Sequence, residues 1–326
     1  MPKLTMIQAI NLALTEMMAE DDSVVVLGED VGINGGVFRA TEGLYDKFGE
    51  GRVIDTPLAE SAIAGTSIGM AMAGLRPVCE MQFSGFSYLA IAQMEGHASR
   101  VRNRSHGRYS VPMVMRMPYG GGVRALEHHS ESREATYAHF PGLKVVIPST
   151  PRNARALLRA AIADPDAVVF MEPKHSYRAW REEVPETPES MPLGVAEHVR
   201  EGKDVTLVAW GAMRRPAEQA AAQLEAKRGA TTHLIDPLTM SPLDGDAIAD
   251  SVKTTGRCVV VQEAPRSLGM SSEIVTRIND KALLYLEAPV ARVTGFDVVT
   301  PGFSREQAYL PTAGRILDAL EQTLDF

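Results

Sequence analysis

The chain has 326 residues, of which 45% are hydrophobic and 23% are charged, and its formal net charge is −8. This length accommodates two domains of about 150 residues each, and the composition is typical of a globular enzyme or enzyme subunit. The acidic balance argues against nucleic acid as the main partner, because phosphate binding needs clustered Lys and Arg. Cys79 and Cys258 lie far apart in apolar sequence. We therefore expect buried free thiols rather than a disulfide or a zinc cluster.

The first residues lead directly into an amphipathic helix, whose apolar face is predicted from the helical spacing of Ile7, Ile10, Leu14 and Met17. The sequence contains neither a secretory signal nor an apolar run approaching the roughly 20 residues that cross a bilayer. These features predict a cytoplasmic protein with no membrane partner.

Short apolar runs alternate with helix-length segments along most of the chain, which is typical of parallel sheets with crossover helices. We expect buried strands at 24–27, 113–115, 144–147, 167–170, 205–210 and 258–261. We expect helices near 59–73, 86–103, 151–163, 214–226 and 312–323. The fold class predicted is α/β, with two tandem domains and mainly parallel sheets.

The alternation is interrupted between about Lys174 and Lys203, where the sequence is charged and contains several prolines. Such a stretch is typical of a connection between domains. We therefore predict a first domain at 1–180, a linker at 181–203 and a second domain at 204–326.

Glu60 opens a predicted helix that is rich in small residues, including Gly65 and Gly69. A carboxylate buried there needs a partner, because an unpaired charge in an apolar setting is costly. A helix cap or an internal salt bridge would satisfy it, and so would a ligand. The small residues allow close approach, either by another helix of the domain or by another subunit.

Glycines crowd the segment 28–38 directly after a predicted strand, as a ligand-binding loop or a plain turn requires. The spacing matches neither GxGxxG nor GxxxxGK[ST], so this loop does not predict a nucleotide site.

Two further segments contain residues suited to chemistry. His128 and His129 follow a glycine turn, and one imidazole there could donate a proton or contact an oxyanion. A metal site at these histidines is disfavoured, because no third ligand lies at a recognisable spacing. The aromatic side chains in 80–88 could be ordinary core residues or a stacking platform for a planar heterocycle.

The order and spacing of several segments over essentially the whole chain resemble the β subunit of thiamine-diphosphate-dependent 2-oxo acid dehydrogenases. The segments are LGEDVG (27–32), GGVF (35–38), DTPLAE (55–60), HHS (128–130), PGLKVV (141–146), WGAM (210–213), SPLD (241–244) and RVTGFD (292–297). The resemblance implies a transketolase-like pyrimidine-binding domain followed by a transketolase C-terminal-like domain that mediates subunit and complex assembly.

In that family the acid matching Glu60 hydrogen-bonds a ring nitrogen of the aminopyrimidine and so promotes loss of the thiazolium proton. The cofactor itself supplies the electron sink for decarboxylation. By the same resemblance Phe86 packs on the pyrimidine, while Gln82 and Tyr88 line the cofactor or substrate cavity. His129 matches the active-site histidine that assists the substrate carbonyl or acyl transfer to a lipoyl group.

Some relatives bind a structural potassium ion, largely through backbone carbonyls. The matching positions are Met113, Ala161, Ile162, Asp164 and Asp166.

Thiamine enzymes that hold the diphosphate themselves carry Gly-Asp-Gly followed by Asn-Asn, which brings in magnesium. Here Gly245-Asp246-Ala247 has no such Asn pair downstream. The resemblance therefore implies that an α subunit holds the magnesium and the diphosphate. It also implies an α2β2 heterotetramer that contains a second β subunit and a lipoyl-bearing dihydrolipoamide acyltransferase as a further partner.

Two positions depart from the family pattern: Gln262 stands where many relatives have His, and Glu131 replaces a common Gln. They affect the expected substrate more than the reaction. We expect oxidative decarboxylation of pyruvate, with a branched-chain 2-oxo acid or acetoin dehydrogenase β subunit as the alternative. A self-sufficient transketolase-like enzyme is disfavoured by the missing diphosphate motif. A non-catalytic assembly subunit is the alternative of another class, although Glu60, Phe86 and His129 are all present.

Overall fold

The computed structural model describes residues 1–189 and 191–326. They form two compact units, residues 1–119 with 136–193 and residues 120–135 with 194–326. The predicted boundaries at 180 and 204 stay a prediction. The structure groups residues 120–135, which the prediction placed in the first domain, with the second unit.

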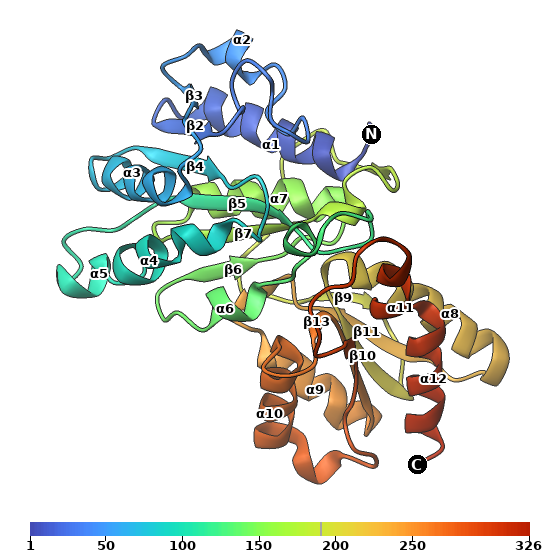
Figure 1. The fold of residues 1–326 in the computed structure, drawn as a ribbon. Helices are drawn as coiled ribbons and strands as arrows, with labels where there is room; N and C mark the ends of the chain where they lie inside the picture. The colour runs from blue at the N-terminus through green and yellow to red at the C-terminus, as the bar shows by residue number, and fades with distance from the viewer. Residues whose placement is uncertain (190) are drawn as a thin grey trace. The chain divides into compact units, whose positions relative to one another are not determined.

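The first unit is built on parallel strands in the order β6-β7-β5-β4-β2-β3 (Figure 1). Their bounds are β2 Val24–Gly28, β3 Val53–Asp55, β4 Arg76–Glu80, β5 Val114–Tyr119, β6 Lys144–Val146 and β7 Val168–Pro173. Strands β2, β5 and β7 are buried along their whole length, as strands covered on both faces are. The short strands β1 (Lys3–Leu4) and β8 (Glu182–Glu183) pair antiparallel beside this sheet.

Two helices of the first unit begin at recognisable capping residues. Thr5 and Gln8 form a capping box at the start of α1, and Thr150 and Asn153 form one at the start of α7. Helices α1 and α7 pack together, with Glu16 of α1 paired to arginines of α7. The bounds are α1 Met6–Glu20, α2 Leu44–Phe48, α3 Glu60–Met72, α4 Ile91–Gln93, α5 Val101–Arg104, α6 Glu134–Ala138 and α7 Pro151–Ala163. The residues of α6 are divided between the two units.

The single helix predicted near 86–103 is wrong. This stretch consists of short pieces instead: a 3₁₀ turn at Ser87–Ala90, α4, a π-helical segment at Met94–Ala98, and α5. Ser99 bonds the carbonyl of Glu95 through its hydroxyl, and Gly96 lies inside the π segment. Both features weaken the regular α-helical ladder.

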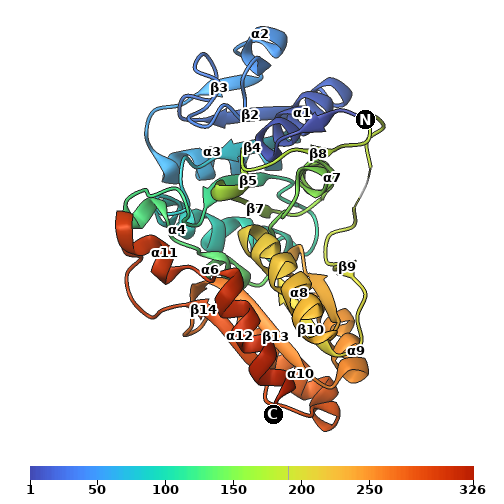
Figure 2. The same cartoon turned by 90° about the vertical axis from the view of Figure 1, so that its right-hand side faces the viewer.

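The second unit has a sheet of its own, in the order β14-β13-β10-β11-β9, with only β9 antiparallel to its neighbour. Figure 1 shows α8 and α12 on one side of this sheet and α9 and α10 on the other, and Figure 2 shows α8 and α12 side by side. The strands are β9 Glu197–Arg200, β10 Val205–Ala209, β11 Thr232–Asp236, β12 Thr239–Ser241, β13 Cys258–Pro265 and β14 Ala291–Gly295. The helices are α8 Arg214–Arg228, α9 Gly245–Thr255, α10 Met270–Ala282, α11 Glu306–Tyr309 and α12 Ala313–Leu324.

Both cysteines are buried and free, as expected, and burial raises the pKa of the Cys79 thiol to about 12. Across the part of the chain that the structure describes, no helix combines the length and apolar character needed to cross a bilayer. The cytoplasmic location stays a prediction.

Candidate active site

Glu60 is the first residue of α3, and only 4% of its surface is exposed. An acid in the first turn of a helix lies close to the free N–H groups and the positive end of the helix dipole. Among the described residues, no ion pair joins this carboxylate to a cation within 4.0 Å. The internal salt bridge considered from the sequence is therefore not present, which leaves Glu60 suited to a ligand.

A second buried carboxyl, Glu29, lies near Glu60 at the end of β2. Burial raises the pKa of Glu29, and the negative charges of Glu60, Asp30 and Glu80 raise it further. Two acids in one dry region are a feature of sites that hold or move protons. Glu29 lies within the LGEDVG segment, and its sequence neighbourhood alone predicts no role for it.

The glycine loop after β2 is a turn held by the side chain of Asp55 and by its own backbone. Asp55 accepts the N–H groups of Gly32 at 2.6 Å and Ile33 at 3.2 Å, and Gly36 donates its N–H to the carbonyl of Asp30 at 2.7 Å. These N–H groups are already hydrogen-bonded to protein acceptors. The structure thus supports the turn interpretation, and this loop offers no phosphate cradle.

The predicted cofactor residues of the aromatic segment lie close to the glycine loop. Gln82 donates from Nε2 to Asp30 at 3.3 Å. Phe83 makes edge contacts with Phe38 and Phe86, whose ring centroids lie 5.5 and 5.7 Å from its own. Phe86 is half-buried, whereas Tyr88 is 51% exposed. The edge contact with Phe83 therefore helps to hold the half-buried ring of Phe86 in place.

A buried ionic cluster that no sequence motif predicts lies across β4, β5 and β7. Arg116 binds Glu172 with two hydrogen bonds of 2.8 and 2.9 Å and also bonds Glu80. Tyr177 donates its hydroxyl hydrogen to Glu172. Burial alone would lower the pKa of Arg116, but Glu172 and Glu80 raise it overall. Burial raises the pKa of Glu80, against the opposing effect of Arg116.

His128 and His129 belong to the second unit, where they end a 3₁₀ turn at Glu127–His129. Their rings lie 4.2 Å apart between centroids, and both side chains are half-buried. Glu131, the departure from the family pattern, forms an ion pair with Arg133. The structure thus holds the two imidazoles against each other on a short turn.

Two buried carboxylates of the second unit anchor the glycine turn that precedes these histidines. Glu263 accepts the N–H of Gly121, and Glu306 accepts those of Gly122 and Arg124 at 2.8 and 3.0 Å. The neighbouring Gln262 bonds the carbonyls of Ala264 and Pro265 and the N–H of Ser271. Gln262 thus serves the backbone of its own unit.

The predicted potassium ligands lie close together, but cationic side chains of the protein contact them. Arg76 donates from one nitrogen to the carbonyls of Ile162 and Asp164 at 2.8 and 3.2 Å. Lys144 pairs with the carboxylate of Asp164, and Arg102 pairs with Asp166. The carbonyl of Met113 accepts the N–H of Val168. The donor set therefore fits potassium poorly, because protein cations contact much of it.

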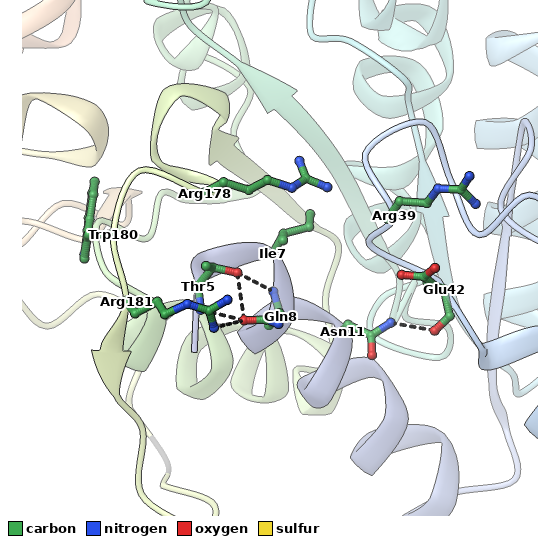
Figure 3. A pocket seen from close by; sticks show the side chains of 9 residues that line it. All are labelled: Thr5, Ile7, Gln8, Asn11, Arg39, Glu42, Arg178, Trp180 and Arg181. Atoms are coloured by element: carbon green, nitrogen blue, oxygen red, sulfur yellow. Dashed lines mark hydrogen bonds between the residues drawn. The ribbon is translucent and has the colours of Figure 1, made fainter. Parts of the chain in front are cut away.

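A cavity of about 550 Å³ opens on the first unit at the start of α1 (Figure 3). Its lining is polar and basic, formed by Thr5, Ile7, Gln8, Asn11, Arg39, Glu42, Arg178, Trp180 and Arg181. Arg181 donates to Gln8 at 2.8 Å, and Asn11 donates to the carbonyl of Glu42 at 3.0 Å. None of the predicted cofactor residues is among the described residues that line it, so we assign it no part in the site.

Two family models together match most of the chain. The model described as "Transketolase, pyrimidine binding domain" matches residues 2–179, and "Transketolase, C-terminal domain" matches residues 194–316. The predicted pair of transketolase-like α/β domains is thereby confirmed.

Curated relatives match over nearly the full length. The chain is 50% identical over 313 residues to "Pyruvate dehydrogenase E1 component subunit beta" of Acholeplasma laidlawii, covering 96% of this chain and 95% of that one. It is 48% identical to the protein of the same name from Bacillus subtilis (strain 168), covering 100% of both. A solved structure titled "Split gene transketolase, inactive beta4 tetramer" matches with a TM-score of 0.81 at 22% identity over 99% of each chain, a likeness of fold alone.

Proposed function

The chain belongs to the family of pyruvate dehydrogenase E1 component β subunits, and from this premise we propose that it acts with an α subunit in the thiamine-diphosphate-dependent oxidative decarboxylation of a 2-oxo acid. The acyl group then passes to the lipoyl group of a dihydrolipoamide acyltransferase. Pyruvate is the proposed substrate, because the relatives are named for it.

The buried carboxyl of Glu60 is the observation that carries this proposal. Thiamine diphosphate, when bound, supplies the electron sink for decarboxylation. Glu60 would hold a proton at a ring nitrogen of the pyrimidine, in a setting that is 4% exposed and contains the second buried acid Glu29. The half-buried ring of Phe86 would pack on the pyrimidine, with Gln82 and Tyr88 at its edge. These residue types fit the heterocycle.

An α subunit is proposed because the described residues suit the pyrimidine end of the cofactor and not its diphosphate end. The N–H groups of Gly32 and Ile33 already bind Asp55, so the diphosphate and its magnesium would be held by the partner. Apolar side chains next to the site are uncovered: Leu58 is 77% exposed and Ile33 is 79% exposed. Burial of these two side chains against an α subunit would add apolar contact to the proposed interface. An α2β2 heterotetramer with a second β subunit is the proposed assembly.

His129 is proposed to assist the substrate carbonyl or acyl transfer, with one of the two neighbouring imidazoles donating a proton. We propose that residues 1–180 bind the pyrimidine and that residues 204–326 serve subunit and complex assembly, connected by 181–203. The contacts of Arg76 and Lys144 count against a potassium ion at the five predicted positions. A cytoplasmic location completes the proposal.

Reconstitution with the cognate α subunit tests the proposal. We expect tight thiamine diphosphate binding only for the two-subunit assembly, and decarboxylation of pyruvate ahead of branched-chain acids and acetoin. Glu60→Gln should reduce kcat by about 10²- to 10⁴-fold, the usual contribution of a positioned acid or base. The exposed Glu183→Gln is the matched control. Tight cofactor binding by this chain alone, or near-normal turnover by Glu60→Gln, would overturn the proposal.

A further inference from the structure

Three side chains that can bind a metal meet at the edge of the second sheet. His198 lies on the edge strand β9, His233 lies on the neighbouring β11, and Glu201 follows β9 directly. Each offers one ligand atom, and these atoms all lie within 4.8 Å of one another. We propose that they form a binding site for a divalent transition metal, best suited to zinc.

An irregular register brings the three side chains to one face. Strands β9 and β11 are antiparallel, with His198 opposite Ile235 and Arg200 opposite Leu234, so two steps along β9 match one step along β11. In a regular strand, residues 198 and 201 would point to opposite faces, because side chains alternate. The extra residue of a β-bulge reverses that alternation. It therefore places both His198 and Glu201 on the face of His233.

The spacing of the ligand atoms is close to that of a tetrahedral zinc site. His198 Nδ1 lies 2.9 Å from His233 Nε2, and Glu201 Oε2 lies 3.7 Å from the same nitrogen. With metal bonds of about 2.0–2.2 Å, ligand atoms around tetrahedral zinc lie about 3.3 Å apart. Shifts of a few tenths of an ångström would bring these two distances to that value, and the 86% exposed side chain of Glu201 can turn to adjust its distance from His198, which lies within 4.8 Å.

A buried hydroxyl network fixes the orientation of His233. Its Nδ1 lies 2.8 Å from Ser251 Oγ, which in turn lies 2.7 Å from Thr206 Oγ1. Ser251 and Thr206 are buried at 4% and 0% exposure. Ligating histidines characteristically use their second nitrogen in this way, because the bond orients the ring toward the metal. His233 therefore presents Nε2 toward His198 and Glu201.

The charge and ligand type also suit a cation. Among the described residues, no Lys or Arg forms an ion pair with Glu201 within 4.0 Å, and the basic group near its carboxylate is the imidazole of His233. Two imidazoles with one carboxylate match the donors of zinc sites that keep a fourth position for water. Such a site would tie the edge strand β9 to β11, which is a structural role independent of the active site.

Zinc titration of the tag-free, metal-stripped full-length chain, repeated on the assembled tetramer, tests the site. We expect one saturable zinc per chain by calorimetry, a rise in melting temperature on adding zinc, and visible d–d absorption bands of low-coordinate cobalt on adding Co²⁺. His198→Ala and His233→Ala should weaken zinc binding by at least about 100-fold. Ser251→Ala should weaken it by about 10- to 100-fold, as loss of an orienting bond does.

His97→Ala, which removes an exposed histidine of the first unit, is the matched control and should bind zinc as the wild type does. Glu201→Gln covers the case in which a histidine variant fails to fold, because its side chain is exposed; it should weaken zinc binding by about tenfold. Absence of saturable zinc binding, or binding that is unchanged in both His198→Ala and Glu201→Gln, would overturn the site and leave an ordinary hydrogen bond between two imidazoles.

Discussion

Glu134 makes the stability of the second unit depend on pH near neutrality. It opens α6 with 0% of its surface exposed, and burial raises its pKa from 4.5 to about 7, with the charge of Glu263 adding to the rise. The pKa is higher in the folded than in the unfolded chain, so the folded state favours the protonated acid. The contribution of Glu134 to stability is thus complete below pH 4.5 and is lost as the pH rises through about 7.

The size of the effect follows from the two pKa values. At about 1.36 kcal/mol for each pH unit between them, ionising Glu134 in the folded chain costs about 3 kcal/mol above neutrality. Near pH 5 most of that cost is absent. Glu134→Gln, which cannot ionise, should therefore raise the free energy of unfolding at pH 8.5 by about 2 kcal/mol more than it does at pH 5. Any loss of packing or hydrogen bonding caused by the amide is the same at both pH values and cancels in this comparison.

Urea denaturation followed by tryptophan fluorescence measures this difference. The chain has two tryptophans, so in a Trp180→Phe background the buried Trp210 reports on the second unit alone. Asp280→Asn, which neutralises an exposed acid of the same unit, is the control and should show the pH dependence of the background. An equal pH dependence in Glu134→Gln and the control would refute the reasoning.

Three further changes test other parts of the structure. Arg116→Met leaves Glu80 and Glu172 buried without their cation and should lower the free energy of unfolding by about 3–5 kcal/mol in denaturant melts. Its control, Arg102→Met, breaks a surface pair with Asp166 and should lower the free energy of unfolding by at most about 1 kcal/mol. Gly142→Ala should be strongly destabilising in the same melts, because the glycine has a φ of +96° and the added Cβ would lie 2.2 Å from the carbonyl oxygen of Ser99. Its control, Gly51→Ala, has open space around the added Cβ and should change the free energy of unfolding by less than about 1 kcal/mol. Equal effects of the two substitutions would contradict the geometry. The melting temperature should be the same in KCl and NaCl, because Arg76 already donates to the carbonyls of Ile162 and Asp164; a higher value in KCl alone would establish a potassium site.

The elements that could be predicted from the sequence are those whose own residues form a recognisable pattern, such as an apolar run or a helix cap. Strand β2 is a continuous apolar run, and α7 begins with a threonine, a proline and the reciprocal partner Asn153, so both were predicted within one residue. The edge strand β9 was not predicted, because its sequence is charged and its face is partly exposed. The helix predicted near 86–103 failed for a related reason: the π segment at Met94–Ala98 changes the hydrogen-bond pattern without changing the apolar content.

The candidate site likewise contains residues that the sequence identifies and residues that it does not. Glu60 could be found because an acid opening a run of small residues is unusual within its own ten-residue window. Glu29 could not, because its proximity to Glu60 depends on β2 and the start of α3 meeting in the folded unit. The proposed metal site is harder still to predict. His198 and His233 are 35 residues apart, the pairing of β9 with β11 brings their ring nitrogens to 2.9 Å, and the bulge between these strands brings Glu201 to the same face.

The anchoring of the histidine turn shows why such contacts are not found from sequence motifs. Gly121 is 142 residues from Glu263, and Gly122 is 184 residues from Glu306, yet both carboxylates bind its backbone N–H groups inside the second unit. A glutamate that binds a distant amide has the same local sequence as one that faces water, because nothing in its own neighbourhood changes. The glycines are no more informative, since a turn needs them whether or not an acid lies behind it. Only the paired strands and packed helices that bring β13 and α11 to this turn identify Glu263 and Glu306 as the residues that anchor the turn preceding His128 and His129.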